Sequence, residues 1–380
     1  MKKIKILVVD YGNVNGGIEN FIFNVFKGID KTKIQMDFLV YNDECYNEKL
    51  LISEGSEIYH TNKPRENYFK CKKYIKSFFI RNSNKYNFIW LQTCSASSIF
   101  AHKLAHKYTT AKVITHAHAS KSEAKNFIFE IIINFLSRVN RKKLLKVSEY
   151  YFACSKNAGM YLFGKKIIYN NHFHIIKNGI SVDKFRYSEE RRKKIRGELN
   201  LNDKDFVVGN VGRITAIKNH DFLIKIFLKI LEYKPNSTLL IIGNGDLEIK
   251  IKHKIKQLGL EPRVLLLGGK KNVNEYLNAM DFFVFPSKFE GLGIAVIEAQ
   301  ASGLPCLITS NLPKELYITN IIYSKSLKEK PENWAKEILK ISINQKRNCY
   351  YKYAIESGFD IETTIKELEN FFINIANQES

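Results

Sequence analysis

The sequence predicts an α/β protein built on parallel, doubly wound sheets. Short apolar runs without polar alternation, the pattern of strands buried on both faces, recur along the whole chain. Many of them are followed by a segment with helical periodicity, and this regular exchange of strand and helix favours parallel pairing. A length of 380 residues, with 45% hydrophobic and 26% charged residues, suits two globular domains with substantial cores.

The expected strands are short and apolar, and several end at a glycine, a proline or a polar turn. In the first half of the chain we expect strands at 4–9, 35–41, 57–60, 87–91, 112–116 and 150–154, and a segment at 173–177 that leads into a turn. In the second half we expect them at 205–212, 238–242, 263–267, 282–285 and 306–309. Helical patterns are clearest at 18–27, 294–301, 331–343, 349–357 and in the last twenty residues.

Positive charge is concentrated in the first half of the chain. The formal net charge is +22, and residues 1–174 hold 28 Lys and Arg against 13 Asp and Glu. Two stretches stand out: 63–85, with eight basic residues among aromatic ones, and 138–146, with five basic residues beside an apolar run. Such basic amphipathic helices lie on anionic membranes, although a solvated helix face with an ordinary core side has the same pattern. No nucleic-acid recognition motif accompanies the charge, so we expect no nucleic-acid partner.

The distribution of cysteines and apolar runs favours a cytoplasmic protein. The six cysteines are scattered without a C-x-x-C motif and are expected to be reduced thiols, neither a disulfide framework nor a zinc site. The N-terminal segment is too short and too soon charged for a signal peptide. The longest apolar run, 127–136, is about half the length of a membrane-spanning helix and contains Glu130. We therefore expect a cytoplasmic protein that is at most peripheral on the inner face of the cell membrane.

The stretch 281–310 has the pattern of an anion site. A buried strand is followed by the loop Glu290-Gly291-Leu292-Gly293 and then by a helix over 294–301. Glycines without side chains and the start of a helix offer backbone N–H groups and a positive dipole end to a phosphate. Glu290 and Glu298 flank this loop; carboxylates do not bind phosphate, but they accept hydrogen bonds from sugar hydroxyls. The combination indicates a nucleotide-sugar.

Further polar residues follow expected strands. His118 comes at the end of the strand at 112–116, on the sheet edge where ligands of open α/β sheets bind. His116 and His118 form an H-x-H pair, but no third metal ligand is nearby, and we expect His116 to be structural. The helix at 18–27 starts at Gly16 and Gly17 without G-x-G-x-x-G, which argues against a nicotinamide-dependent dehydrogenase.

Taken together, these motifs resemble the signature of the family 4 retaining GT-B glycosyltransferases, and most closely the bacterial enzymes of capsular and exopolysaccharide clusters. The resemblance covers almost the whole chain. It is carried by the E-x7-E spacing from Glu290 to Glu298 within FPSKFEGLGIAVIEAQASGLP and by G-R-x4-K-N-H starting at Gly212. The segments GGIENF, HAHAS and SGFDIE agree with it.

The resemblance implies a GT-B fold, in which two Rossmann-like domains face each other across a cleft. The segment IIKNGISVDKF looks like the hinge of the family, except that Ser181 stands where aspartate is more usual. We accordingly expect an N-terminal, acceptor-side domain at 1–177 and a nucleotide-sugar-binding domain at 178–359. The last helix, 360–380, is expected to pack back on the first domain, as in relatives.

The resemblance also implies a role for each site residue. Arg213 and Lys218, together with the loop amides, would stabilise the charge on the donor diphosphate without a metal or other cofactor. Glu298 would bind the ribose, Glu290 the hydroxyls of the donor sugar, and His118 the sugar near its anomeric carbon. The remaining expected donor-binding residues are Gly16, Gly17, Gly212, Asn219, Gly291, Leu292 and Gly293.

The implied reaction transfers a hexosyl unit from a nucleoside-diphosphate sugar, such as a UDP-sugar, to a lipid-linked oligosaccharide. Two other classes of function remain open from the sequence. A nucleotide-sugar epimerase has the same architecture and needs no acceptor. A non-catalytic role, as a basic nucleic-acid binder or a glycosyltransferase-like partner subunit, would not need Arg213, Lys218, Glu290 and Glu298, all of which are present.

Overall fold

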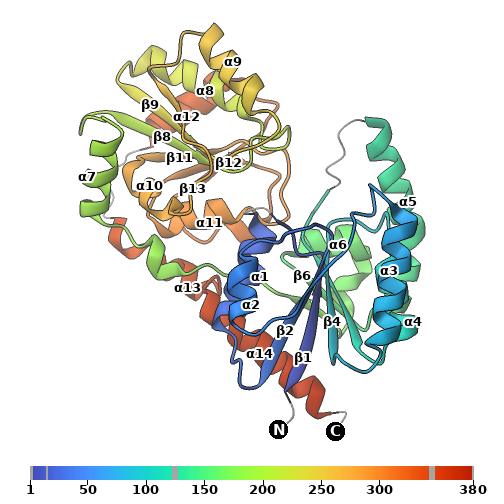
Figure 1. The fold of residues 1–380 in the computed structure, drawn as a ribbon. Helices are drawn as coiled ribbons and strands as arrows, with labels where there is room; N and C mark the ends of the chain where they lie inside the picture. Colours follow the sequence, from blue (N-terminus) through green and yellow to red (C-terminus); the bar gives the residue numbers. More distant parts are fainter. Residues whose placement is uncertain (1–2, 14–15, 122–126, 342–346, 379–380) are drawn as a thin grey trace. The chain divides into compact units, whose positions relative to one another are not determined.

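The computed structural model describes residues 3–13, 16–121, 127–341 and 347–378, and the chain forms two compact units (Figure 1). The first unit comprises residues 1–180 together with 361–380, and the second comprises residues 181–360. The division falls within three residues of the boundary that we placed at 177/178. Each unit contains one parallel sheet, so the predicted α/β class with two Rossmann-like domains is confirmed.

The sheet of the first unit has seven parallel strands in the order β3-β2-β1-β4-β5-β6-β7. Strand β1 lies between β2 and β4, and the chain winds away from it in both directions, which is the doubly wound arrangement. The bounds are β1 Ile4–Val9, β2 Ile34–Val40, β3 Ile58–His60, β4 Phe88–Thr93, β5 Lys112–Ala117, β6 Tyr150–Ala153 and β7 Phe173–Ile175.

Helices cover both faces of this sheet (Figure 1). Alternate residues of β1 point to opposite faces. Ile6 and Val8 pack with α1 and α14, whereas Leu7 and Val9 pack with α3 and α4. The bounds of the helices are α1 Gly17–Gly28, α2 Glu48–Ser53, α3 Tyr68–Arg81, α4 Phe100–Tyr108, α5 Phe127–Val147, α6 Lys156–Phe163 and α14 Ile361–Asn377.

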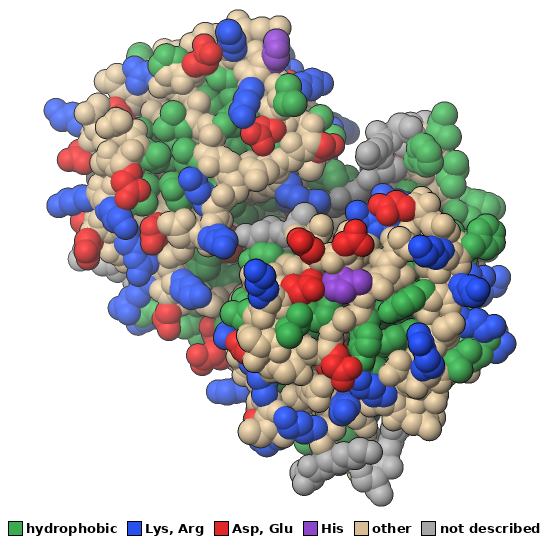
Figure 2. Space-filling model, in the orientation of Figure 1, with side chains coloured by type: hydrophobic (Ala, Val, Ile, Leu, Met, Phe, Trp, Pro, Cys, Tyr) green, Lys and Arg blue, Asp and Glu red, His purple; other side chains and the backbone are tan. Residues whose placement is uncertain are grey.

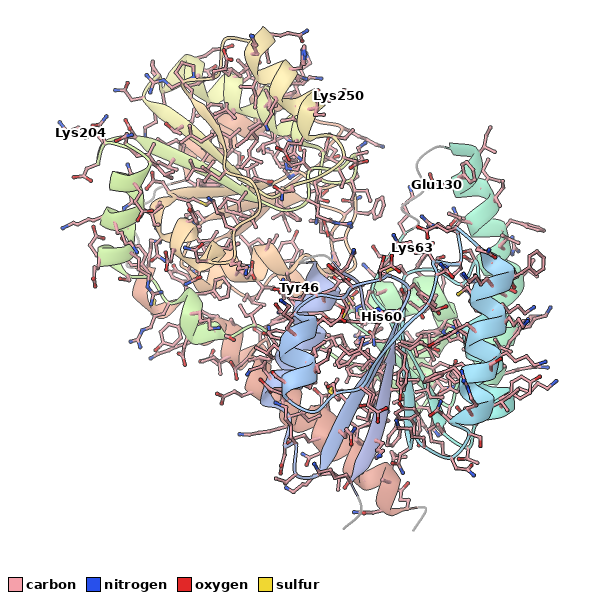
Figure 3. All side chains as sticks on the ribbon, viewed as in Figure 1. Tyr46, His60, Lys63, Glu130, Lys204 and Lys250 are labelled. Atoms are coloured by element: carbon pink, nitrogen blue, oxygen red, sulfur yellow. The ribbon has the colours of Figure 1, made fainter. Side chains whose placement is uncertain are left out.

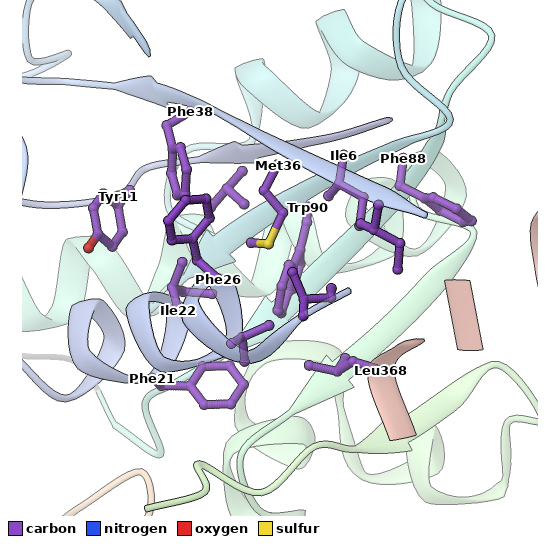
Figure 4. Packing of buried hydrophobic residues seen from close by; sticks show 14 of the residues in the cluster. Ile6, Tyr11, Phe21, Ile22, Phe26, Met36, Phe38, Phe88, Trp90 and Leu368 are labelled. Carbon is purple, nitrogen blue, oxygen red and sulfur yellow. The ribbon is translucent and has the colours of Figure 1, made fainter. Parts of the chain in front are cut away.

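The core under α1 is rich in aromatic side chains (Figure 4). The rings of Phe21 and Trp90 pack edge to face with centroids 6.2 Å apart, and both side chains are buried. The last helix belongs to the same core, because Leu368 and Phe372 are buried in it and Phe372 lies 5.1 Å from Phe88. The C-terminal segment is therefore an integral part of the first unit.

The sheet of the second unit has six parallel strands in the order β10-β9-β8-β11-β12-β13. The strands are β8 Phe206–Val211, β9 Ser237–Ile242, β10 Val264–Leu266, β11 Phe282–Phe285, β12 Cys306–Thr309 and β13 Ile322–Lys325. The helices are α7 Glu189–Glu198, α8 His220–Tyr233, α9 Glu248–Gln257, α10 Val273–Ala279, α11 Ile294–Ala301, α12 Pro331–Lys340 and α13 Tyr351–Glu356.

Several elements of the second unit were not predicted: helices α7, α9 and α10 and strand β13. Strand β13 is a short edge strand in which only Ile322 is buried and Ser324 is exposed, so it lacks the apolar run of a buried strand. Helix α7 has the sequence EERRKKIRGE, with almost no apolar face. It is held by polar contacts instead: Arg192 forms an ion pair of 2.7 Å with Asp281, and Arg196 donates to the carbonyl oxygen of Ala279 at 3.0 Å. These contacts form between residues far apart in the chain, so no local pattern in the sequence predicts this helix.

A helix that crosses a bilayer needs about 20 predominantly apolar residues. Among the described residues, every helix is too short or too polar to cross a bilayer.

Candidate active site

Two loops of the second unit come together at the carboxyl ends of adjacent strands. Strands β8 and β11 are neighbours in the sheet, and the loops that follow them lead into α8 and α11. The amide of Lys288 donates to the carbonyl oxygen of Ile217 at 2.8 Å, and Nδ2 of Asn219 donates to the carbonyl oxygen of Pro286 at 3.3 Å. These bonds hold the two sequence motifs against each other.

Lys218 and Glu290 form an ion pair between these loops. Nζ of Lys218 lies 2.6 Å from Oε1 of Glu290, and the two side chains are only 19% and 12% exposed. The hydroxyl group of Ser287 donates to the same carboxylate oxygen, and Nζ lies 4.9 Å from the centre of the Phe285 ring. The predicted phosphate-binding cation and the predicted sugar-binding carboxylate are thus direct neighbours. Ser287 and Phe285, which orient them, were not predicted.

The position of Arg213 depends on a close approach of two backbone segments. Arg213 is exposed in the turn after β8, directly behind Gly212. A Cβ atom on Gly243 would lie 2.1 Å from the carbonyl oxygen of Gly212, and Gly243 has φ +140°. Only glycine allows this approach. A Cβ on Gly212 itself would lie 3.3 Å from Cε of Lys218, so this glycine leaves room for the lysine side chain.

Helix α11 begins without a side-chain cap. Its N-cap residue, Gly293, has the left-handed conformation φ +96°, ψ 55°, and makes no side-chain cap. The amide of Val296 donates to the carbonyl oxygen of Gly293 at 2.9 Å. Leu292 is buried and fixes the loop that contains Gly291. The earliest amides of a helix lack the i−4 acceptor that later amides have, and the helix dipole is positive at this end. The predicted anion site thus lies at the start of α11, and its binding of a phosphate stays a prediction.

Glu298 lies within α11, and its carboxyl group is desolvated. Burial raises the pKa of Glu298 to about 8, although the side chain retains some solvent exposure. In the part of the chain that the structure describes, no hydrogen bond or ion pair engages this carboxyl group. An isolated carboxyl group in this position costs free energy unless a ligand supplies the hydrogen bonds.

His118 follows β5 in the first unit and is oriented by Gln92. Nε2 of His118 lies 2.7 Å from Oε1 of Gln92, whose amide nitrogen in turn donates to the carbonyl oxygen of Trp90. This arrangement places the proton of His118 on Nε2 and leaves Nδ1 as an acceptor. Nδ1 has no protein partner among the described residues. Burial lowers the pKa of His118 to about 3, so the ring is neutral. Gln92, which lies on the neighbouring strand β4, was not predicted.

His116 is a core residue. Its ring is fully buried, stacks on Trp90 at 5.7 Å and meets Phe21 edge to face at 5.7 Å. Burial, and to a lesser degree His118, lowers the pKa of His116 well below its usual value. Apolar packing on both sides matches the structural role that we expected. Nowhere in the described ranges do three or more His, Cys, Asp or Glu side chains gather as they would around a metal ion.

The glycine pair lies at the start of α1, in the first unit. Gly16 is the N-cap residue and accepts the first helical hydrogen bond, from the amide of Asn20 at 3.0 Å. A Cβ on Gly17 would meet nothing within 4 Å. A side chain at position 17 would therefore meet no steric conflict with the described residues, and the donor-binding role of Gly17 stays a prediction.

Known proteins resemble this chain over most of its length. It is 27% identical over 380 residues to "Putative glycosyltransferase EpsF" of Bacillus subtilis (strain 168), covering 98% of this chain and 97% of the relative. It is 22% identical over 319 residues to "UDP-Gal:alpha-D-GlcNAc-diphosphoundecaprenol alpha-1,3-galactosyltransferase" of Escherichia coli, covering 80% and 79%. The crystal structure of Anabaena Alr3699/HepE in complex with UDP-glucose superposes with a TM-score of 0.76 at 20% identity, covering 98% of this chain and all of HepE.

The two parallel sheets and these likenesses define the class: the chain is a glycosyltransferase with the GT-B fold. Residues 191–357, most of the second unit, match the family described as glycosyl transferases group 1. The chain therefore carries the domain of that family. The resemblance of its motifs to GT-B glycosyltransferases is confirmed, whereas membership of family 4 and retention of configuration stay predictions.

Proposed function

We propose that the chain transfers a hexosyl unit, with retention of anomeric configuration, from a UDP-sugar to a hydroxyl group of a lipid-linked oligosaccharide in capsular or exopolysaccharide synthesis. The ion pair of Lys218 with Glu290 beside the uncapped start of α11 carries this proposal, because it places a cation, a carboxylate and helix amides together. HepE, which has been crystallised with UDP-glucose, supports the choice of donor, and the Escherichia coli relative, which acts on a diphosphoundecaprenol-linked sugar, supports the choice of acceptor.

In this proposal Arg213, Lys218 and the amides of Gly291 to Gly293 stabilise the negative charge that grows on the departing diphosphate. Fixed donors of this kind act most strongly where charge develops, and they need no reorganisation during the reaction. Glu298 accepts hydrogen bonds from the ribose, and Glu290 from the donor sugar. His118 contacts the sugar near its anomeric carbon through its neutral acceptor nitrogen. Gly16, Gly17, Gly212 and Asn219 shape the donor site.

We further propose that no metal or other cofactor takes part, since the two cations and the helix amides suffice for the diphosphate charge. Addition of EDTA should leave the transfer rate unchanged, and added Mg²⁺ should not restore or increase it. A rate that collapses with EDTA and recovers with a divalent cation would refute this part.

The enzyme can be tested by incubation with a panel of nucleotide-sugars and detection of nucleotide release, with and without a lipid-linked acceptor. UDP-sugars should give acceptor-dependent release. Arg213→Ala should lower kcat/KM by about 100-fold, the usual effect of removing one charge-stabilising donor. Formation of an epimer without acceptor would indicate the epimerase alternative, and full activity of Arg213→Ala would remove that residue from the mechanism.

The proposed acceptor is linked to a lipid, so the proposed reaction takes place at a membrane. We propose that the chain works in the cytoplasm, peripherally on the anionic inner face of the cell membrane, through the basic helices of the first unit. Helix α3 has four exposed lysines and no acidic residue, which fits attraction to anionic lipid.

A further inference from the structure

Helix α5 of the first unit exposes a continuous set of apolar side chains. Five large apolar residues, which we call the apolar ridge, each expose between 45 and 69% of their surface: Ile128, Ile131, Ile132, Phe135 and Val139. Most of them are three or four positions apart, a spacing that places side chains on one side of a helix. Single exposed apolar residues are ordinary, but a contiguous set on one helix marks a binding surface.

Within the described ranges, the contacts that anchor α5 lie outside the apolar ridge. Helix α5 is anchored by its second half, where Leu144 is fully buried and Asn140 donates to the carbonyl oxygens of Ala96 and Ser97 at 3.0 and 3.1 Å. Arg141 donates to the carbonyl oxygen of Tyr161 at 2.9 Å. The first turns of α5 rise beyond the end of α3 in Figure 1. Apolar surface that the unit leaves uncovered in this way is available to a partner.

Positive charge surrounds the apolar ridge. Helix α5 contains five basic residues and one acidic residue, Glu130, and the exposed cations Arg138, Lys142 and Lys143 continue from the ridge. Helix α3 packs on the same face of the sheet, next to α4, and exposes Phe69 at 82% among its lysines. Figure 2 shows green apolar side chains gathered beside blue cations on this side of the first unit.

We propose that the apolar ridge inserts into the headgroup region of an anionic lipid bilayer while the cations of α5 and α3 hold lipid phosphates. Apolar side chains beside basic ones on a helix that cannot span the membrane are the requirements for binding in the plane of the interface. A second copy of the chain is a poorer occupant, because a symmetric contact between two such faces would oppose like charges. This inference deepens the proposed function. Lipid binding by the apolar ridge can be tested by itself, and only the biological purpose of that binding rests on the proposed function.

Sedimentation with vesicles tests the insertion. The chain should co-sediment with phosphatidylcholine vesicles that contain phosphatidylglycerol. Ile128→Ser with Phe135→Ser should lower the partition coefficient at least ~10-fold, because interfacial binding scales with the apolar area buried. The matched control is Ile249→Ser with Tyr233→Ser, two side chains of the second unit that are 78% and 54% exposed. The control should bind as strongly as the unchanged chain.

A charge-reversal pair tests the electrostatic part. Lys142→Glu with Lys143→Glu should abolish the preference for phosphatidylglycerol, and the binding of the unchanged chain should weaken as salt is added. Lys204→Glu with Lys250→Glu makes the same change of charge on the second unit and should leave binding intact (Figure 3).

The outcomes separate this inference from its rivals. Vesicle binding that survives the double serine substitution in α5 would overturn it. A dimer in light scattering that becomes a monomer on the same substitution, without any vesicle binding, would make the ridge an interface between copies. A chain that binds vesicles as expected but transfers no sugar would refute the proposed function and leave this inference standing. Donor hydrolysis in detergent-free buffer should be equal in all these variants.

Discussion

Glu290 and Lys218, which are 72 residues apart in the sequence, form an ion pair of 2.6 Å in the second unit. The pair joins the loops after two adjacent strands, and the hydroxyl group of Ser287 donates to the same carboxylate oxygen as Lys218. Before any ligand binds, the lysine charge is thus compensated by a carboxylate. A diphosphate that arrives at Lys218 must compete with Glu290 or share the cation with it, so the two residues are expected to act as a unit.

The first prediction concerns this ion pair. Lys218→Ala should lower kcat/KM by about 100-fold through the loss of a charge-stabilising donor. It should also reduce the free energy of unfolding by about 1 to 3 kcal/mol, because the mostly buried carboxylate of Glu290 loses its cation. Steady-state kinetics and urea unfolding measure the two effects.

A matched control and a double variant make this prediction specific. Lys229→Ala removes a cation of the exposed pair with Glu232 on the same helix and should change neither quantity much. Lys218→Ala combined with Glu290→Gln should recover part of the lost stability, because no unpaired charge remains. Independent, additive losses in the double variant would contradict the idea of a coupled unit.

The second prediction concerns Glu298. Because the pKa of Glu298 is raised to about 8 in the fold from a usual value of 4.5, the folded chain retains a proton that the unfolded chain releases. The protonated carboxyl group therefore makes its full contribution to the free energy of unfolding below pH 4.5. That contribution is lost as the pH rises from 4.5 to 8. Glu298→Gln should remove this dependence and raise the free energy of unfolding at pH 8 by about 1 kcal/mol or more.

The same substitution should weaken UDP binding, because the amide replaces a group that accepts hydrogen bonds from the ribose hydroxyls. Calorimetric titration with UDP and thermal unfolding at pH 5 and pH 8 measure both effects. A variant that is more stable and binds UDP less tightly is the expected result. Unchanged UDP affinity would contradict the role of Glu298 in ribose binding.

The third prediction concerns His118 and Gln92. Since burial holds the pKa of His118 at about 3, the ring stays neutral from pH 5 to 8 and contributes no limb to the pH–rate profile there. Gln92→Leu removes the acceptor that fixes the proton on Nε2, so it should lower kcat at least ~10-fold and leave KM for the donor nearly unchanged. Gln92→Glu retains an acceptor at this position and should recover part of the rate. Equal losses in both Gln92 variants would contradict the orienting role.

The fourth prediction concerns Gly243. Gly243→Ala would place Cβ 2.1 Å from the carbonyl oxygen of Gly212, so the turn that carries Arg213 must move. We expect a loss of about 2 kcal/mol or more in the free energy of unfolding, together with weaker donor binding. Gly197→Ala is the control, because its Cβ would lie in open space within α7 and helix propensity favours alanine. Thermal unfolding of both variants checks the contrast.

Much of this molecule could be predicted from the sequence because its signals are local. The strand Phe282–Phe285 and the helix Ile294–Ala301 have the bounds that their apolar run, proline and glycines predicted. A buried parallel strand must be apolar on both faces, and a phosphate loop must lack side chains, so these requirements appear directly in the residue types. The class of enzyme followed from the same motifs.

Other features were decided only by tertiary structure. The ion pair of Lys218 with Glu290 and the hydrogen bond of His118 with Gln92 join side chains from neighbouring strands or loops, and no spacing along the chain records which strands become neighbours. Whether an apolar side chain is buried is likewise a property of the packed sheet. Residues of 127–136 have the composition of a core helix, yet most of their described side chains lie in solvent. Burial depends on which surfaces the other helices already cover, and only the folded chain determines that.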